Sequence, residues 1–93
     1  MGRWQKRTTA ACAAEYPDHL EFFGGTYRGT RGEGQRFVVW DAGIYQVVAP
    51  DQVRIGTATD ELVSYRFTVM PTLLTFIDQA GCTFEYERAA APP

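Results

Sequence analysis

The sequence predicts an all-β fold, a small antiparallel up-and-down barrel of about seven to eight strands. From Leu20 onward, apolar and polar residues alternate in short runs, which is the pattern of half-buried strands. Turn residues bound these runs, and no interval between them is long enough for a crossover helix, which excludes a parallel α/β sheet. Because no predicted helix covers the sheet, we expect it to close into a barrel or to pair with a second copy.

The first four predicted strands are separated by residues typical of turns. The first strand contains Gly24-Gly25, which permits the sharp bend that a small barrel needs. A glycine-rich loop at residues 29–34 leads to the second strand, and Asp41-Ala42-Gly43 turns the chain into the third. Pro50-Asp51 places proline at its preferred turn position before the fourth. These strands are predicted at residues 20–30, 35–40, 44–49 and 52–58.

The last three predicted strands carry the clearest alternation. After a turn at Thr59-Asp60, residues 62–69 alternate strictly, with Val63, Tyr65, Phe67 and Val69 on one face. Met70-Pro71 ends this strand, and the next is predicted at residues 72–77. Residues 78–81 form a hairpin loop that ends in glycine, and residues 82–88 form the final strand.

Length and composition indicate one small domain. The chain has 93 residues, of which 45% are hydrophobic and 22% charged, so it can form one core and is not a disordered tail. We expect a flexible N-terminal arm at residues 1–19, a single barrel domain at residues 20–88 and a tail at residues 89–93. The net charge of −2 argues against a dedicated DNA-binding module, and no apolar run is long enough to span a membrane.

The two cysteines, Cys12 and Cys82, lie far apart in the chain. A disulfide between them would close a long loop, but the interpretation favoured from sequence is a free thiol on the arm and a small buried apolar residue in the core. With one histidine in the chain, the usual four-ligand zinc site is excluded. Because the favoured interpretation leaves both cysteines unpaired, we expect a reducing, cytoplasmic location, with secretion as the alternative if a leader has been truncated.

Residues near both ends of the predicted barrel resemble a known family. Gly25-Thr26-Tyr27 is similar to the G-x-W motif that opens the barrel of lipocalins and other calycins, with tyrosine in place of tryptophan. Arg88 ends the last predicted strand, where these families place an arginine over the aromatic ring. The resemblance, to short bacterial lipocalin-like domains, implies that Arg88 stacks on Tyr27 and joins the first strand to the last. It also implies a barrel that binds a small hydrophobic molecule.

Aromatic side chains at inward positions are the candidate ligand-binding residues. Together with Phe37 or Trp40, they either fill the core of a small barrel or surround a small apolar ligand. The tyrosines favour a pocket, because a buried hydroxyl needs a hydrogen-bond partner that a ligand or water can supply. The predicted ligand-binding residues are Tyr45, Tyr65, Phe67, Phe76, Phe84 and Tyr86.

The sequence contains no combination of residues that indicates catalysis, a metal or a cofactor. The histidine, His19, precedes the first predicted strand, and no nucleophile and base can be paired. The loop at residues 29–34 is rich in glycine, but a strand follows it, whereas phosphate-binding loops open a helix. Arg28, Arg31 and Arg36 surround this loop and are a minor candidate for contact with an anionic group.

Three functions remain as hypotheses, and an enzymatic function ranks below all three. The first is a lipocalin-like domain that binds a small hydrophobic ligand in the barrel interior. The second is a barrel with a filled core that acts through its surface, as an interaction or inhibitor-like module, or as a homodimer. The third is an oligonucleotide-binding barrel, which the acidic composition opposes. Its contacts would come from Arg28, Arg31, Arg36, Trp40 and Tyr45.

Overall fold

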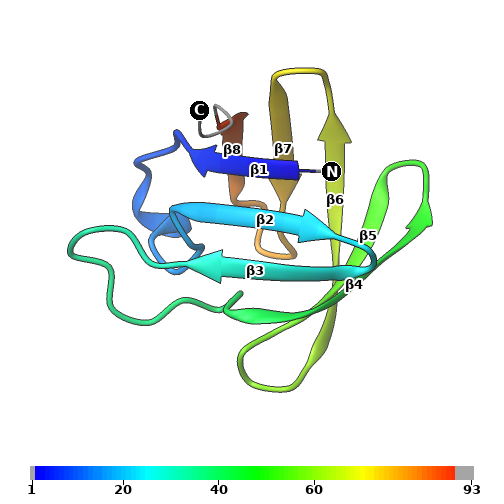
Figure 1. Ribbon diagram of the computed structural model, residues 1–93, viewed down its shortest axis with the longest axis horizontal. Coiled ribbons are helices and arrows are strands. Elements are labelled where there is room, and N and C mark those ends of the chain that lie inside the picture. Colours follow the sequence, from blue (N-terminus) through cyan, green and yellow to red (C-terminus); the bar gives the residue numbers. More distant parts are fainter. Residues whose placement is uncertain (1, 90–93) are drawn as a thin grey trace.

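The computed structural model describes residues 2–89 and shows a closed antiparallel barrel of eight strands (Figure 1). Each strand pairs with its neighbours in the sequence, and β1 also pairs with β8, so the sheet has no free edge. The predicted all-β, up-and-down barrel is therefore confirmed. The strands are β1 (Gly2–Lys6), β2 (His19–Phe23), β3 (Thr26–Thr30), β4 (Ala42–Ala49), β5 (Gln52–Gly56), β6 (Leu62–Val69), β7 (Leu73–Ile77) and β8 (Thr83–Arg88).

Alternating side chains along the strands build one aromatic core. In β6, Tyr65 and Phe67 are buried inside the barrel, whereas Ser64 and Arg66 are exposed on its outer face. Trp40 comes from the loop before β4 and occupies the same core, in edge contact with Tyr65 at 4.9 Å between ring centroids. A loop residue thus fills space that eight short strands leave between them.

The segment expected to be a flexible arm, residues 1–19, instead contains the strand that closes the barrel. β1 pairs with β2 and β8, and its Trp4 is fully buried. The prediction failed because this short strand has a single large apolar residue, too few for a recognisable alternation. Of the expected tail, residues 90–93 lie outside the described residues.

Two predicted strands also differ in the structure. The run at residues 20–30 is not one bent strand but a hairpin, β2 and β3, because Gly24 and Gly25 both adopt positive φ angles and form the turn. Residues 35–40 form a loop and no strand. Their backbone groups bond to other loops instead: Val39 N donates to the Glu15 carbonyl at 2.8 Å, and the Val39 carbonyl accepts from Ala58 N at 2.7 Å.

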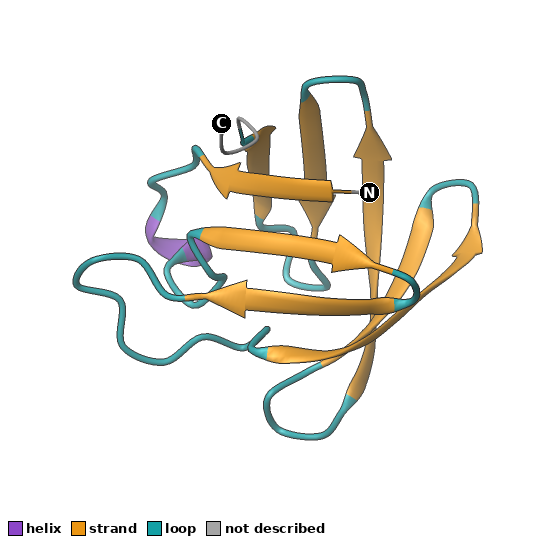
Figure 2. Cartoon of the chain, viewed as in Figure 1, coloured by secondary structure: helices purple, strands orange, loops and turns teal. Residues whose placement is uncertain are grey.

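Residues 8–18, which we call the plug segment, pack against one end of the barrel. They include the short 3-10 helix η1 (Ala11–Ala13), which Figure 2 shows beside the ends of β1 and β2. The nearly buried Lys6 Nζ donates to the carbonyls of Ala13 at 2.7 Å and Tyr16 at 2.8 Å and lies 3.3 Å from an Asp18 carboxylate oxygen. The Tyr16 ring stacks on Phe84 at 3.9 Å, so an aromatic ring of the plug segment belongs to the core.

A disulfide links Cys12 of the plug segment to Cys82 before β8, with 5.9 Å between the two Cα atoms. The expectation of two free thiols is therefore wrong. Sequence separation did not indicate the pairing, because only the closure of the barrel brings these two residues together. The favoured reducing location was based on those free thiols and loses that basis.

Candidate functional site

The predicted ligand-binding residues lie together inside the barrel, where they contact one another. Tyr65, Phe67, Phe76, Phe84 and Tyr86 are buried, and Tyr45 is half-buried against Phe22. Phe76 and Phe84 stack at 5.5 Å between ring centroids, and Trp40 meets the Phe76 ring edge-on at 4.9 Å. Such contacts at 4.5–7 Å are typical of a packed aromatic core.

The centre of this core is filled. A side chain that lines an empty space large enough for water keeps some accessible surface. Trp40, Phe84 and Tyr86 keep none, and the same holds for the aliphatic residues Ile55 and Leu74. The interior around these residues therefore offers no preformed volume for a ligand.

The buried tyrosine hydroxyls are bonded to the protein itself. Tyr86 donates to the Pro17 carbonyl at 2.7 Å, Tyr27 to the Gly56 carbonyl, and Tyr16 to an Asp78 carboxylate oxygen at 2.8 Å. Burial is the main reason that the pKa of each of these three tyrosines is raised. These three hydroxyls therefore have acceptors within the protein and need no ligand as a hydrogen-bond partner.

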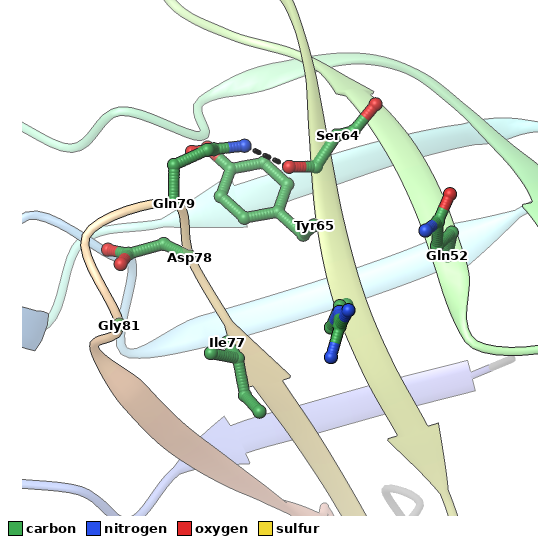
Figure 3. A pocket seen from close by; sticks show the side chains of 8 residues that line it. Gln52, Ser64, Tyr65, Ile77, Asp78, Gln79 and Gly81 are labelled. Carbon is green, nitrogen blue, oxygen red and sulfur yellow. Dashed lines mark hydrogen bonds between the residues drawn. The ribbon is translucent and has the colours of Figure 1, made fainter.

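An open depression of about 430 Å³ lies on the outer face of β5, β6 and β7. Figure 3 shows Gln79 reaching over Tyr65, where its amide donates to the Ser64 carbonyl of β6. Ile77 supplies an apolar wall. The lining consists of Gln52, Ser64, Tyr65, Arg66, Ile77, Asp78, Gln79 and Gly81.

The carboxylate that lines this depression, Asp78, is committed to structural bonds. Asp78 accepts hydrogen bonds from the backbone N–H groups of Ala80 and Cys82 and from the Tyr16 hydroxyl. Burial raises the pKa of Tyr65, which opposes its use as a base. The Trp40 indole N–H has no partner in hydrogen-bond geometry within residues 2–89. Its proximity to the Tyr65 hydroxyl lowers the pKa of Tyr65, but the larger effect of burial outweighs it. This arrangement provides no nucleophile and base.

The arginine expected to pack over Tyr27 packs over a different ring. Arg88 Cζ lies 4.4 Å from the centroid of Trp4, and the two residues are direct partners across β1 and β8. Tyr27 lies on β3, away from β8. Gly2-Arg3-Trp4 thus has glycine and tryptophan at the spacing of the G-x-W motif, and the expected stacking of Arg88 on Tyr27 is wrong.

An apolar row on the outside of the barrel was missed at the level of sequence. Phe23, Ile44 and Leu62 are 49%, 57% and 53% exposed. The pairs Phe23–Thr26, Thr26–Ile44 and Gly56–Leu62, with Gly56 next to Ile44, place them in one row that follows the curved outer surface of the barrel. We call it the outer row. Each member occupies an outward position of its strand, where alternation predicts a polar residue. Apolar residues at such positions are the sequence signal that could have revealed the outer row.

The proposed oligonucleotide contacts are only partly on the surface. Arg28, Arg31 and Arg36 are exposed, and Arg31 donates to the Arg36 carbonyl at 3.0 Å. Trp40 has no exposed surface, and Tyr45 packs against Phe22 inside the barrel. Neither ring forms a platform on which a base could stack.

Metal ligands do not gather in the part of the chain that is described. Residues 2–89 contain no group of three His, Cys, Asp or Glu side chains that could hold a metal ion, and His19 is exposed on β2. The same residues include no helix with the length and apolar character needed to cross a membrane. No family model matches the chain, and no curated protein or solved structure is significantly similar to it.

Proposed function

We propose that this domain is a non-enzymatic binding module that acts through the outer face of β2–β6. The proposal is supported by the difference in solvent exposure between the aromatic interior and the outer row. Trp40, Phe84 and Tyr86 have no exposed surface in the filled interior, whereas Ile44 and Leu62 of the outer row are about half exposed. Exposed apolar residues that lie close together, as Ile44 and Leu62 do on either side of Gly56, are typical of interaction sites.

The proposal ranks the filled-core hypothesis above an interior hydrophobic ligand. An interior ligand would have to displace rings that already contact one another, such as Phe76 and Phe84. Displacing packed side chains costs several kcal/mol in contacts and strain, about 3–5 for one large aromatic residue. A partner on the outer row needs no such displacement.

A finer part of the proposal places the barrel among the calycins. It is supported by the Gly2-Arg3-Trp4 spacing on β1 and by the stacking of Arg88 over Trp4.

We also propose that the folded protein resides in an oxidising compartment, because a disulfide such as Cys12–Cys82 persists there.

Methyl-resolved NMR tests whether an apolar molecule binds outside or inside. Isoleucine and leucine methyl groups report on both places, since Ile44 and Leu62 are exposed while Ile55 and Leu74 are fully buried. On titration with 8-anilinonaphthalene-1-sulfonate, we expect shifts at Ile44 and Leu62 and none at Ile55 and Leu74. Saturable shifts at Ile55 and Leu74 would favour the interior ligand instead, and no shift at any of the four would also refute the proposal.

A further inference from the structure

The loop between β3 and β4 carries two exposed arginines, Arg31 and Arg36. Neither forms an ion pair within residues 2–89, whereas three basic residues near the N-terminus each face a carboxylate. Figure 1 shows this loop bending away from the strands. Two positive charges are thus presented at one place without a neutralising carboxylate, on a chain whose net charge is −2.

Both arginines line one open depression of about 440 Å³ beside this loop, a size within the range of small-molecule sites. The ring of Phe37 lines it too and is 50% exposed. A guanidinium group matches the geometry of a carboxylate or a phosphate, and an exposed ring offers a surface on which another ring can stack. The remaining lining residues are Gly29, Thr30, Val38, Asp41 and Ala58.

The backbone on both sides of these side chains is fixed. The side chain of Gln35, directly before Arg36, makes four hydrogen bonds at 2.6–3.2 Å, one with the Gly32 N–H and three with backbone groups of the plug segment. Val39 is held by the two backbone hydrogen bonds described above. Arg31 is positioned by its own bond from Nη1 to the Arg36 carbonyl at 3.0 Å. Because the chain is already ordered, a ligand pays little entropy to organise it.

The charges of the lining favour an anion. Asp41 is the carboxylate that lines the depression, and its Oδ1 accepts a hydrogen bond from the Ala42 N–H at 2.6 Å. Two arginines and one aspartate leave one formal positive charge in excess. Arg28, which the sequence grouped with Arg31 and Arg36, lines a separate depression of about 140 Å³.

From these features we infer that this depression binds a small molecule that carries an anionic group beside an aromatic ring. The anionic group, a carboxylate or a phosphate, binds Arg31 and Arg36, and the ring stacks on Phe37. The site shares no residue with the outer row and goes beyond the proposed function. Because exposed charges are well solvated, the expected dissociation constant is roughly 1 mM at low salt.

Methyl-resolved NMR tests the class of ligand, because Val38 and Ala58 line the depression. Phenyl phosphate and benzoate are the probes, inorganic phosphate supplies an anion alone, and benzyl alcohol supplies a ring alone. We expect saturable shifts at Val38 and Ala58 with at least one probe, and roughly tenfold weaker binding of inorganic phosphate and benzyl alcohol. The probe that binds more tightly identifies the anion.

Three results of this titration would overturn the inference. One is the absence of saturable shifts with both probes at concentrations far above the expected dissociation constant. Another is binding of inorganic phosphate or benzyl alcohol as tight as that of the better probe. The third is a set of shifts confined to Ile44 and Leu62, which would place the probe on the outer row.

Substitutions test the two halves of the site. Arg31→Gln and Arg36→Gln should each weaken binding of the better probe about tenfold, and Phe37→Ala should weaken it by a similar factor. Arg54→Gln is the matched control, since Arg54 is an exposed arginine of β5 that also has no ion pair in the described part of the chain. All four replaced side chains are exposed, and amide spectra check that the variants fold. Unchanged binding by both loop arginine variants, or an equal loss in Arg54→Gln, would refute the site.

Discussion

The guanidinium of Arg88 lies 4.4 Å from the centre of the Trp4 ring, and this contact joins the last strand of the barrel to the first. The same arginine donates through Nε to the Pro71 carbonyl at 2.8 Å, so it also holds the turn between β6 and β7. One side chain therefore connects β8, β1 and the turn between β6 and β7.

Loss of this contact should weaken barrel closure. We predict that Arg88→Ala lowers the free energy of unfolding by about 1 kcal/mol, because a cation over an indole face and a hydrogen bond are lost together. Urea denaturation measures the change. Arg66→Ala, on the exposed face of β6, is the control and should have almost no effect. Equal destabilisation by the two variants would show that the stacking contributes nothing.

The disulfide should stabilise the fold strongly. Replacing both Cys12 and Cys82 by alanine removes a cross-link between residues 70 positions apart, which is worth about 4 kcal/mol in the chain-entropy model. We expect the denaturation midpoint to fall by a corresponding amount, and reduction of the wild type to reproduce the shift. Thiol titration of the native protein should find no free thiol. Two reactive thiols in the native state would contradict the pairing.

Lys6 should hold the plug segment in place. Lys6→Met removes the two hydrogen bonds from the lysine Nζ to the Ala13 and Tyr16 carbonyls, and we predict that the free energy of unfolding falls by about 2 kcal/mol. Hydrogen exchange should speed up in the plug segment before the rest of the barrel. Its neighbour Arg7, an exposed residue with an ion pair at 4.0 Å, provides the matched Arg7→Met variant, for which we expect little change.

The buried tyrosines should make the protein sensitive to alkali. The pKa values of Tyr16, Tyr27, Tyr65 and Tyr86 are raised above 10.0, mainly by burial. The unfolded chain therefore releases these protons first as the pH rises, so their contribution is complete below pH about 10 and is lost above it. Absorbance at 295 nm should show that these rings ionise only together with unfolding. Ionisation of all tyrosines in a fully folded barrel near pH 10 would disagree.

A cavity made in the core should create the binding that the wild type lacks. Phe84→Ala removes a ring with no exposed surface and should cost about 3–5 kcal/mol. Benzene should then bind inside the variant and raise its thermal midpoint, with no effect on the wild type. A wild-type protein stabilised by benzene as strongly as the variant would show that its interior is not filled.

The local alternation of apolar and polar residues predicted the strands in the second half of the chain well. The strands β6 and β8 follow from clean alternation and from turns at Thr59-Asp60 and residues 78–81. Residues 35–40 have the composition of a strand, yet Trp40 is drawn into the core, and the backbone of Val39 pairs with other loops. Tertiary contacts overrode strand propensity there.

The candidate sites were harder to predict, because they depend on register. Phe23, Ile44 and Leu62 are distant in sequence, and only the pairing of five strands aligns them. A shift of one residue in any pairing would break the row. The interior aromatic residues were correctly assigned to inward positions, but whether they surround a space or fill it depends on volumes that alternation does not encode.

The pairing of β1 with β8 also determines when the barrel can form during synthesis. The backbone N–H of Ala89 donates to the Arg3 carbonyl at 3.0 Å, so contacts at the seam join the beginning and the end of the described chain. Until β8 leaves the ribosome, the nascent strands form at most an open sheet with two unpaired edges. Closure is thus a late, long-range step, which favours slow folding.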